Sequence, residues 1–364
     1  MSKDNDLVVD VTTAPRSKPE ADAPTRPGGA LTDHAYSMRW SRRRSWQGMT
    51  IADRDRLPSV RPTSSALNYG QGVFDDLAAY RMTDGSIAVY RPDSHVKRLN
   101  NGARRMALPQ LDFDRVWLAI RRLVDVDSAW IPAEPGSALL LHSVLAGNGP
   151  TLEVAPAEEC LFTIVASPLA RQAPAELPVR AMVVDDYVRA WPGGTGDINA
   201  IGNYGQGLVP REIAANYDYH HVLWVGGDTE RRVQQVGAMN AFFVIDGVLT
   251  TPSLDGTVRP GITRDSIIKL ARDAGTTVVE RPVPLAEVLQ GISDGRITEC
   301  FGTGTVEGVV SINGIGYQGE EYRLPGSVAV ASHLREVLKG IHRGDVIDRF
   351  GWMRRLTEVS TVHA

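Results

Sequence analysis

The sequence predicts a two-domain globular protein that mixes helices and strands, and three observations lead to this expectation. The chain has 364 residues, which is more than a single hydrophobic core usually organises. Its residues are 43% hydrophobic and 23% charged, an ordinary balance for folded domains. Short apolar runs typical of strands lie among segments whose apolar residues repeat at helical spacing. We therefore expect a mixed fold with a core in each domain.

Charge and hydrophobicity exclude several classes of protein. A formal net charge of -4 argues against nucleic-acid binding through a basic face. We expect no membrane segment, because no apolar run approaches the roughly 18 residues that a spanning helix needs. Cys160 and Cys300 each lie in an apolar, strand-like run and lack metal-ligand spacing. Two buried free thiols and no metal site are expected, in a cytoplasmic protein.

Composition changes along the chain suggest where its parts begin and end. Residues 1–30 are rich in Ser, Pro, Asp and Ala without a signal-peptide-like apolar stretch, so we expect a disordered tail. A first domain is expected over 31–170 and a second over 183–364. An Ala- and Pro-rich connector at 171–182 joins them.

The first half contains both kinds of element. The run 38–46 holds four arginines, which suggests either an anion site or, as we prefer, a solvated edge strand. A strand is expected at 86–90, followed by a helix at 94–106 that Asp93 caps. Residues 113–126 repeat apolar side chains at helical spacing and predict an amphipathic helix.

Further elements follow the same rules. Thr263 is a candidate N-cap for a helix over 264–275, and 206–216 predicts a helix. The Asp246-Gly247 pair lies between two apolar runs, which strongly predicts a β-hairpin over 241–251. Strands are expected at 137–147, 160–166 and 222–225.

The most informative segment is 187–205, YVRAWPGGTGDINAIGNYG, which holds five glycines. Glycines at this density allow sharp turns and a close approach of the backbone to a ligand. Tyr187, Arg189, Trp191 and Tyr204 surround them with rings, a cation and hydroxyls. Taken alone, the segment fits either a binding loop or a plain turn between domains.

This segment resembles YxRAWxGGxGDxKxGGNY, the catalytic loop of branched-chain amino acid aminotransferases, the fold-type IV pyridoxal phosphate enzymes. Other segments extend the resemblance: LNYGQGVFDDLAAYR is similar to LHYGQEIFEGLKAYR, and VRPGITRDS is similar to LPGITRDS. RPDSHVKRL is similar to the family segment whose second arginine, here Arg98, holds the phosphate of the cofactor. The resemblance covers about residues 31–356. It implies an α+β fold, with a small α+β domain before a larger β-rich pseudo-barrel domain, and a homodimer.

The resemblance also assigns roles to residues. Those that fall on cofactor-binding positions are Arg98, Arg189, Tyr204, Gln235, Ile262, Thr263, Gly304 and Thr305. Those that fall on substrate-pocket positions are Tyr69, Phe74, Leu140, Trp191 and Val306. A guanidinium such as that of Arg98 suits bidentate phosphate binding, and a helix start beside Thr263 offers backbone N–H groups to an anion.

Three positions that carry the family's chemistry are changed. Asn199 stands where the lysine that bonds the cofactor is expected, and an amide cannot form that bond. Gln235 replaces the glutamate that pairs with the pyridine nitrogen, and His142 replaces the arginine that recognises a carboxylate. The groups that we expect to act in catalysis are Asn199, Tyr204, His142, Asp75 and Glu307.

Three functions fit this pattern of losses. The first is a repurposed enzyme, of the kind found in secondary metabolism, that performs acid/base, cyclisation or elimination chemistry. Its substrate would be a small anionic or phosphorylated molecule, with no covalently bound cofactor but room for pyridoxal or pyridoxamine phosphate held non-covalently. The second is residual or stoichiometric transamination of branched-chain amino acids. The third is a non-catalytic pseudoenzyme or ligand-binding partner.

Overall fold

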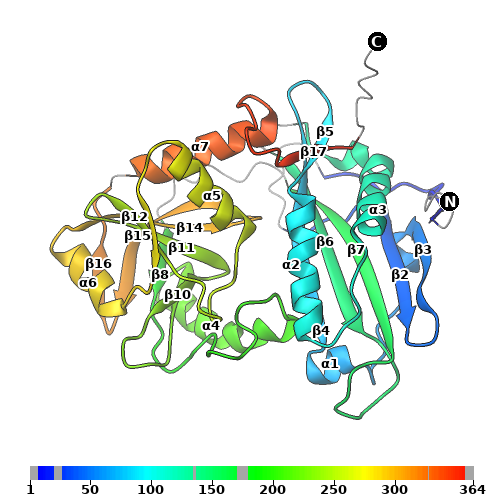
Figure 1. The fold of residues 1–364 in the computed structure, drawn as a ribbon, viewed down its shortest axis with the longest axis horizontal. Helices are drawn as coiled ribbons and strands as arrows, with labels where there is room; N and C mark the ends of the chain where they lie inside the picture. The colour runs from blue at the N-terminus through cyan, green and yellow to red at the C-terminus, as the bar shows by residue number, and fades with distance from the viewer. Residues whose placement is uncertain (1–6, 20–26, 134–136, 170–178, 327, 357–364) are drawn as a thin grey trace. The chain divides into compact units, whose positions relative to one another are not determined.

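The computed structural model describes residues 7–19, 27–133, 137–169, 179–326 and 328–356 (Figure 1). Two compact units make up the chain. The first contains Met1–Ala173 and Lys339–Ala364, and the second contains Pro174–Leu338. The sequence predicts 183–364 as one domain, but the C-terminal segment adds a strand to the sheet of the first unit. Most of the connector predicted at 171–182 lies outside the described residues, and its last part forms a strand of the second unit.

The first unit is built on a mostly antiparallel sheet with the order β1-β3-β2-β7-β6-β4-β5-β17. Its strands are β1 Val8–Val9, β2 His34–Ser41, β3 Ser45–Asp53, β4 Gly72–Arg81, β5 Ile87–Tyr90, β6 Ala138–Gly147, β7 Glu159–Leu169 and β17 Met353–Arg355. Helices α2 (Pro92–Arg105) and α3 (Phe113–Val126) pack on β4 and β2 and touch each other, so they cover one face. Short helices lie at α1 Ser65–Tyr69, η2 Arg54–Arg56 and η3 Ser128–Trp130.

The two helices of this unit test the helix signals of the sequence. The predicted helix over 113–126 is confirmed as α3, whose N-cap Asp112 accepts a hydrogen bond from the backbone of Arg115 at 3.0 Å. Helix α2 is also present, but the predicted cap is wrong. Its N-cap is Arg91 in the left-handed region, without a side-chain cap bond, and Pro92 occupies the first turn. Proline is favoured there because its missing N–H would have no partner inside the helix.

The basic run 38–46 is not an edge strand, as the sequence suggests. Strand β2 lies between β3 and β7, and the run spans the end of β2, a turn at 42–44 and the start of β3. The edge expectation fails because β2 is paired on both sides over its whole length. Three of the four arginines, Arg42, Arg43 and Arg44, occupy a hairpin turn, while Arg39 lies on β2, and all four are exposed.

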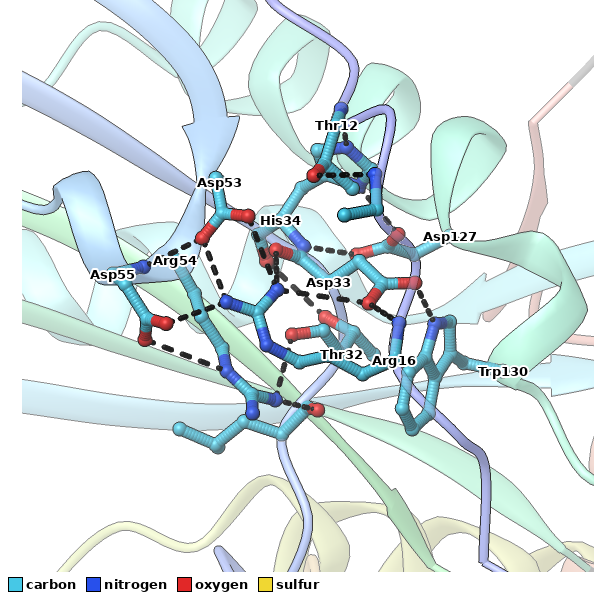
Figure 2. A network of polar contacts seen from close by, with 12 residues as sticks. Thr12, Arg16, Thr32, Asp33, His34, Asp53, Arg54, Asp55, Asp127 and Trp130 are labelled. Atoms are coloured by element: carbon cyan, nitrogen blue, oxygen red, sulfur yellow. Dashed lines mark hydrogen bonds and ion pairs between the residues drawn. The ribbon is translucent and has the colours of Figure 1, made fainter.

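Residues 7–19 form an N-terminal arm on the first unit, so the expectation of a disordered tail is wrong for them. Strand β1 pairs in parallel with β3. The guanidinium of Arg16 donates to Asp53 at 2.8 Å and to Asp55 at 2.5 Å, and its backbone N–H donates to Asp33 at 2.8 Å (Figure 2). Three carboxylates around one arginine hold the arm, although its composition resembles that of disordered segments.

The second unit is a closed six-stranded barrel, which confirms the predicted pseudo-barrel. Its strands follow the order β10-β9-β8-β15-β14-β11, and β11 pairs back with β10. Strands β12 and β13 extend it beyond β11, and β16 pairs with β15. The bounds are β8 Val179–Met182, β9 His221–Val225, β10 Val233–Val236, β11 Met239–Ile245, β12 Val248–Pro252, β13 Val278–Arg281, β14 Ile297–Gly304, β15 Gly308–Tyr317 and β16 Glu320–Arg323.

Successive side chains of a barrel strand point to opposite faces, and both faces of β11 are buried. Met239 and Phe243 of β11 belong to the apolar core cluster, whereas Asn240 between them is buried on the other face. The hairpin predicted at Asp246-Gly247 is confirmed, since both residues have positive φ, as a two-residue primed turn requires. Helices lie at α4 Leu208–Asn216, α5 Ile262–Asp273, α6 Leu285–Ser293 and α7 Ala329–Arg343, together with the short helices η4 Ile201–Asn203 and η5 Gly205–Gly207.

Both cysteines are free and buried, as the sequence predicts. Burial raises the pKa of the Cys160 thiol to about 12 and shifts that of Cys300 in the same direction. Thiols held in this protonated state are poor nucleophiles and poor metal ligands. Neither cysteine is therefore a candidate for catalysis.

Candidate functional site

The glycine-rich loop over 187–205 is held in one conformation by Asn203. Its Oδ1 accepts from the hydroxyl of Thr195 at 2.6 Å, while its Nδ2 donates to the carbonyls of Thr195 at 2.8 Å and Ile198 at 2.9 Å. One side chain thus satisfies three groups on the far side of the turn. Asn199 lies inside the segment that these bonds close, so its backbone position is fixed.

Arg189 anchors the same loop from the other side. Its two terminal nitrogens donate to the backbone carbonyls of Thr257 at 2.8 Å and Gly196 at 2.9 Å. Burial, together with the nearby positive charge of Arg259, lowers the pKa of Arg189 to about 10. Nη2 holds the loop itself and Nη1 ties it to the segment before α5, so this geometry supports a positioning role. The predicted contact of Arg189 with a cofactor stays a prediction.

Asn199 is 5% exposed and its side-chain oxygen accepts two hydrogen bonds. Tyr204 donates its hydroxyl at 3.2 Å, and Arg259 donates Nη1 at 2.9 Å. The structure therefore brings Asn199 and Tyr204 together, as the sequence predicts. Arg259 is the residue that sequence reasoning missed. Its signal was present, because VRPGITRDS carries arginine where the similar pattern LPGITRDS carries leucine.

Arg259 also connects the loop to the turn between β10 and β11. Its Nη2 donates to the carbonyl of Ala238 at 2.6 Å, and Gln235 donates Nε2 to the same oxygen at 3.4 Å. Asn199, Tyr204, Arg259, Ala238 and Gln235 form one connected set, which we call the Asn199 network. It joins three segments that are distant in sequence. Asn199 and Tyr204 are predicted catalytic residues, and Tyr204 and Gln235 are predicted cofactor positions.

A second group of site residues lies around the start of α5. The N-cap is Gly261, not Thr263, and it makes no side-chain cap bond. Thr263 is instead buried in the first turn beside Ile262. The positive end of a helix dipole at such a start favours an anion. The helix begins two residues earlier than predicted because glycine can take the cap position without a side chain.

Asn240 of barrel strand β11 lies against this helix start. Asn240 packs so closely on Gly261 that a Cβ there would overlap its Oδ1. Asn240 is also the cross-strand partner of Thr303 on β14, two residues before Thr305. The hydroxyl oxygen of Thr303 is buried and has no hydrogen-bond partner among the described residues. The first turn of α5 and the end of β14 are thus brought together through Asn240.

The turn after β14 holds the remaining predicted residues of the second unit. Thr305, Val306 and Glu307 connect β14 to β15, and all three are partly buried. The carboxylate of Glu307 lies over Gly304, where a Cβ would overlap its Oε2. A side chain at 304 would therefore force the Glu307 carboxylate to move from this position.

In the first unit, Asp75 is buried within an ionic cluster. Its oxygens accept from Nε of Arg98 at 2.7 Å, from Nη2 of Arg98 at 2.9 Å and from the His95 ring at 2.6 Å. Burial by itself would raise the pKa of Asp75, but the charge of Arg98 and the interactions with Arg98 and His95 outweigh it and lower the pKa to about 2. Such a carboxylate stays ionised and paired, which argues against the predicted acid/base role. Its role is to orient Arg98, whose predicted phosphate contact stays a prediction.

His142 lies on the opposite face of the sheet from Asp75. In the β4–β6 pairing His142 faces Asp76, and its Nδ1 contacts Asp76 Oδ1 at 2.7 Å. Burial favours the neutral ring, but Asp76 outweighs this effect and raises the pKa of His142. The Phe74 ring lies 5.5 Å from the imidazole. Strand alternation puts Asp75 and Asp76 on opposite faces, so Asp76, which is not among the predicted site residues, is the aspartate that contacts His142.

The other predicted pocket residues have simple surroundings. Leu140 is buried two residues from His142 on β6. The hydroxyl of Tyr69 donates to the backbone carbonyl of Leu152, and the Tyr69 ring is partly exposed. The half-exposed Trp191 packs its ring over Gly227. Apolar and aromatic surfaces like these fit a substrate pocket, and that role stays a prediction.

Two kinds of site are not found in the part of the chain that the structure describes. In those residues, no group of three or more His, Cys, Asp or Glu side chains could hold a metal ion. None of the described helices is long and apolar enough to cross a membrane.

The fold, with its closed barrel and glycine-rich loop, is that of the fold-type IV aminotransferases. Residues 72–315 match the family model described as amino-transferase class IV, so the chain belongs to this family. It is 37% identical over 336 residues to a branched-chain-amino-acid aminotransferase of Mycobacterium tuberculosis, covering 89% of this chain and 90% of the relative. It is 32% identical to branched-chain-amino-acid aminotransferase 2 of Bacillus subtilis, covering 97% of both chains.

A solved structure supports the same assignment. The branched-chain amino acid aminotransferase of Escherichia coli superposes with a TM-score of 0.70 at 25% identity. The match covers 84% of this chain and 97% of that protein. The chain is therefore similar to branched-chain aminotransferases over nearly their whole length, and the changes at single site positions arise within an intact fold.

Proposed function

We propose that this chain binds pyridoxal or pyridoxamine phosphate without a covalent bond and performs acid/base chemistry on a small molecule. The observation that carries the proposal is the environment of Asn199. Its oxygen is fully engaged by Arg259 and Tyr204, and its nitrogen is an amide nitrogen. Because the amide lone pair is delocalised, this nitrogen cannot attack a carbonyl as a lysine amine does.

The residues around the helix start fit the phosphate end of such a ligand. Helix α5 presents its first N–H groups without a side-chain cap, and the positive end of its dipole favours an anion. The buried Thr303 hydroxyl lacks a partner among the described residues, which is costly unless a ligand supplies one. Thr305, two residues further, adds a second hydroxyl at the same end of β14.

At the pyridine ring of the cofactor, the residue to consider is Gln235, and its fit is weaker than that of the residues at the phosphate end. Gln235 is 1% exposed, and its Oε1 has no partner among the described residues. A glutamine can hydrogen bond to a pyridine nitrogen, but it adds no charge that would keep the nitrogen protonated. When bound, the cofactor supplies an electron sink, and a neutral partner makes that sink weaker. The site therefore fits binding of the group better than the chemistry of ordinary transamination.

No other lysine is suited to replace the missing one. The second unit, residues 174–338, contains Lys269 as its single lysine. Its amine lies on α5 and pairs with Asp265 one turn away at 2.9 Å. In the first unit, Lys97 neighbours Arg98 on α2, and adjacent helix residues point about 100° apart. A covalent link through a relocated lysine is not favoured by these positions.

The pair of His142 and Asp76 supplies the best acid/base group. Asp76 holds Nδ1 of the ring, so Nε2 is the atom that can exchange a proton with a ligand. The raised pKa keeps the ring protonated to a higher pH than a free histidine, which suits a general acid near neutrality. Tyr204 orients Asn199 in the second unit, and Glu307 remains a second carboxylate candidate.

The test traps any covalent link with borohydride and detects it by mass spectrometry. Purified protein is mixed with pyridoxal phosphate, treated with borohydride, denatured and analysed by mass, with Asn199→Lys as the matched control. We expect binding by calorimetry but no modification of the wild-type chain at a defined lysine, and stoichiometric modification at position 199 of the variant. Modification of one wild-type lysine in stoichiometric amount would overturn the proposal.

A second candidate is transamination in a slow or stoichiometric form, and the relatives' names favour it. It predicts that protein loaded with pyridoxamine phosphate converts one equivalent of a branched-chain keto acid. Sustained turnover with a branched-chain amino acid and 2-oxoglutarate would favour this function over the first. Asn199→Lys in the same assay shows whether the remaining residues can support turnover.

A further inference from the structure

The orientation of the Asn199 amide is fixed by the donors that surround it. An arginine can only donate hydrogen bonds, so the atom that faces Arg259 must be the oxygen. The Tyr204 hydroxyl reaches the same oxygen. The Nδ2 group, with two N–H donors, therefore points away from both. Among the residues that the structure describes, no acceptor is recorded for it.

We propose that Arg259 holds Asn199 as a hydrogen-bond donor to the carbonyl oxygen of a bound aldehyde or keto ligand. This inference rests on the proposed function, because the phosphate-binding residues deliver the ligand to the site. In the similar family pattern, the lysine at this position bonds to the carbonyl carbon of the cofactor. In this chain, Asn199 hydrogen bonds to the carbonyl oxygen instead, and no covalent bond is formed. Asn199 is the binding residue, and Arg259 is the positioning residue.

Arg259 is well placed for this role. Its Nη2 is fixed on the Ala238 carbonyl at 2.6 Å while Nη1 reaches Asn199 at 2.9 Å, so the guanidinium bridges two segments. Its Nε is buried and has no hydrogen-bond partner among the described residues. The positive charge withdraws electron density from the amide oxygen, which makes the N–H groups of the same amide stronger donors. A leucine at 259 could neither fix the Asn199 amide by a hydrogen bond nor strengthen its N–H donors by a positive charge.

The rigid loop completes the arrangement. The side chain of Asn203, which follows Asn199 in the chain, hydrogen bonds to Thr195 and Ile198, which precede it. Since the backbone is held, the amide does not have to be ordered when the ligand binds. A donor that is already oriented loses less entropy on binding and discriminates better between ligands that have or lack an acceptor.

The test compares two probes that share the ring and the phosphate. Pyridoxal 5′-phosphate carries the carbonyl oxygen, and 4-deoxypyridoxine 5′-phosphate lacks it. Dissociation constants for both are measured by calorimetry on the full chain. We expect the wild type to prefer the first probe by about tenfold, as one well-oriented hydrogen bond allows. Asn199→Asp, which keeps the oxygen for Arg259 and removes the N–H donors, should abolish this preference.

Arg259→Leu is the second variant, and it should reduce the preference while leaving the phosphate contacts in place. Thr305→Val is the matched control, because it should weaken both probes equally and keep their ratio. Circular dichroism checks that each variant is folded. A wild type that binds both probes equally overturns the inference but not the proposed function. A preference that survives in Asn199→Asp also overturns it, and failure of both probes to bind overturns both proposals.

Discussion

Replacing Asp75 with asparagine should destabilise the first unit, because Asp75 holds the Arg98 guanidinium and the His95 ring in a buried position. It is 1% exposed and accepts three hydrogen bonds, two from Arg98 and one from His95. An asparagine has a single side-chain acceptor atom in place of two oxygens. At least one of the donors would then face an N–H group without water to replace the lost bond.

The magnitude follows from the pKa of Asp75. A carboxyl whose pKa is lower in the folded state stabilises the fold above its unfolded pKa and loses this contribution as pH falls through the folded value. The change from 3.8 to about 2 corresponds to about 2 kcal/mol at neutral pH. An unsatisfied buried donor adds roughly 1 kcal/mol or more. We therefore expect Asp75→Asn to lower the free energy of unfolding by about 3 kcal/mol at pH 7.

Urea unfolding followed by tryptophan fluorescence measures this loss, at pH 7 and at several values between pH 4 and pH 2. The gap between wild type and variant should narrow with acid over that range, as Asp75 itself becomes protonated. Glu159→Gln is the control, since Glu159 pairs with Arg61 at an exposed position and should cost less than about 1 kcal/mol. Equal losses in the two variants, or a gap that stays constant in acid, would refute the reasoning.

Three further perturbations test other parts of the structure. Asp76→Asn should lower the pKa of His142, which an NMR titration of the ring would measure; an unchanged midpoint would show that the pair does not form in solution. Arg16→Ala should release the N-terminal arm, so that limited proteolysis cleaves the arm faster while the rest of the chain stays resistant. Gly304→Ala should displace the Glu307 carboxylate and lower stability by roughly 1 kcal/mol in thermal unfolding; an unchanged melting temperature would show that Glu307 does not hold this position in solution.

Local signals in the sequence predicted much of the fold. Helix α3 has the predicted bounds because its apolar spacing and the cap at Asp112 agree. The hairpin at Asp246-Gly247 follows from two residues that tolerate positive φ. The barrel was predicted from the resemblance and not from periodicity. Its strands are buried on both faces, so they lack a clear alternation of polar and apolar residues.

Several failures share a physical cause, because they depend on contacts between residues far apart in sequence. The N-terminal arm has the composition of a disordered segment, but Arg16 meets aspartates that lie 17 to 39 positions away. The contact of Asn199 with Arg259 spans 60 positions. By contrast, the opposite orientations of Asp75 and Asp76 follow from strand alternation and could have been predicted.

Four departures from the family pattern form two contacting pairs, whereas Gln235 stands outside them and keeps a buried Oε1 without a partner among the described residues. Arg259, where the similar pattern has leucine, donates to Asn199, where it has lysine. Asp76, where the pattern has glycine, meets His142 at the position of the carboxylate-binding arginine. Unselected losses would leave a buried polar group without a partner at each changed position, at a cost of about 1–3 kcal/mol each. Within each pair the two changed residues hydrogen bond to each other. Exchanging both members of one pair for the family's residues should therefore cost less stability than exchanging either alone.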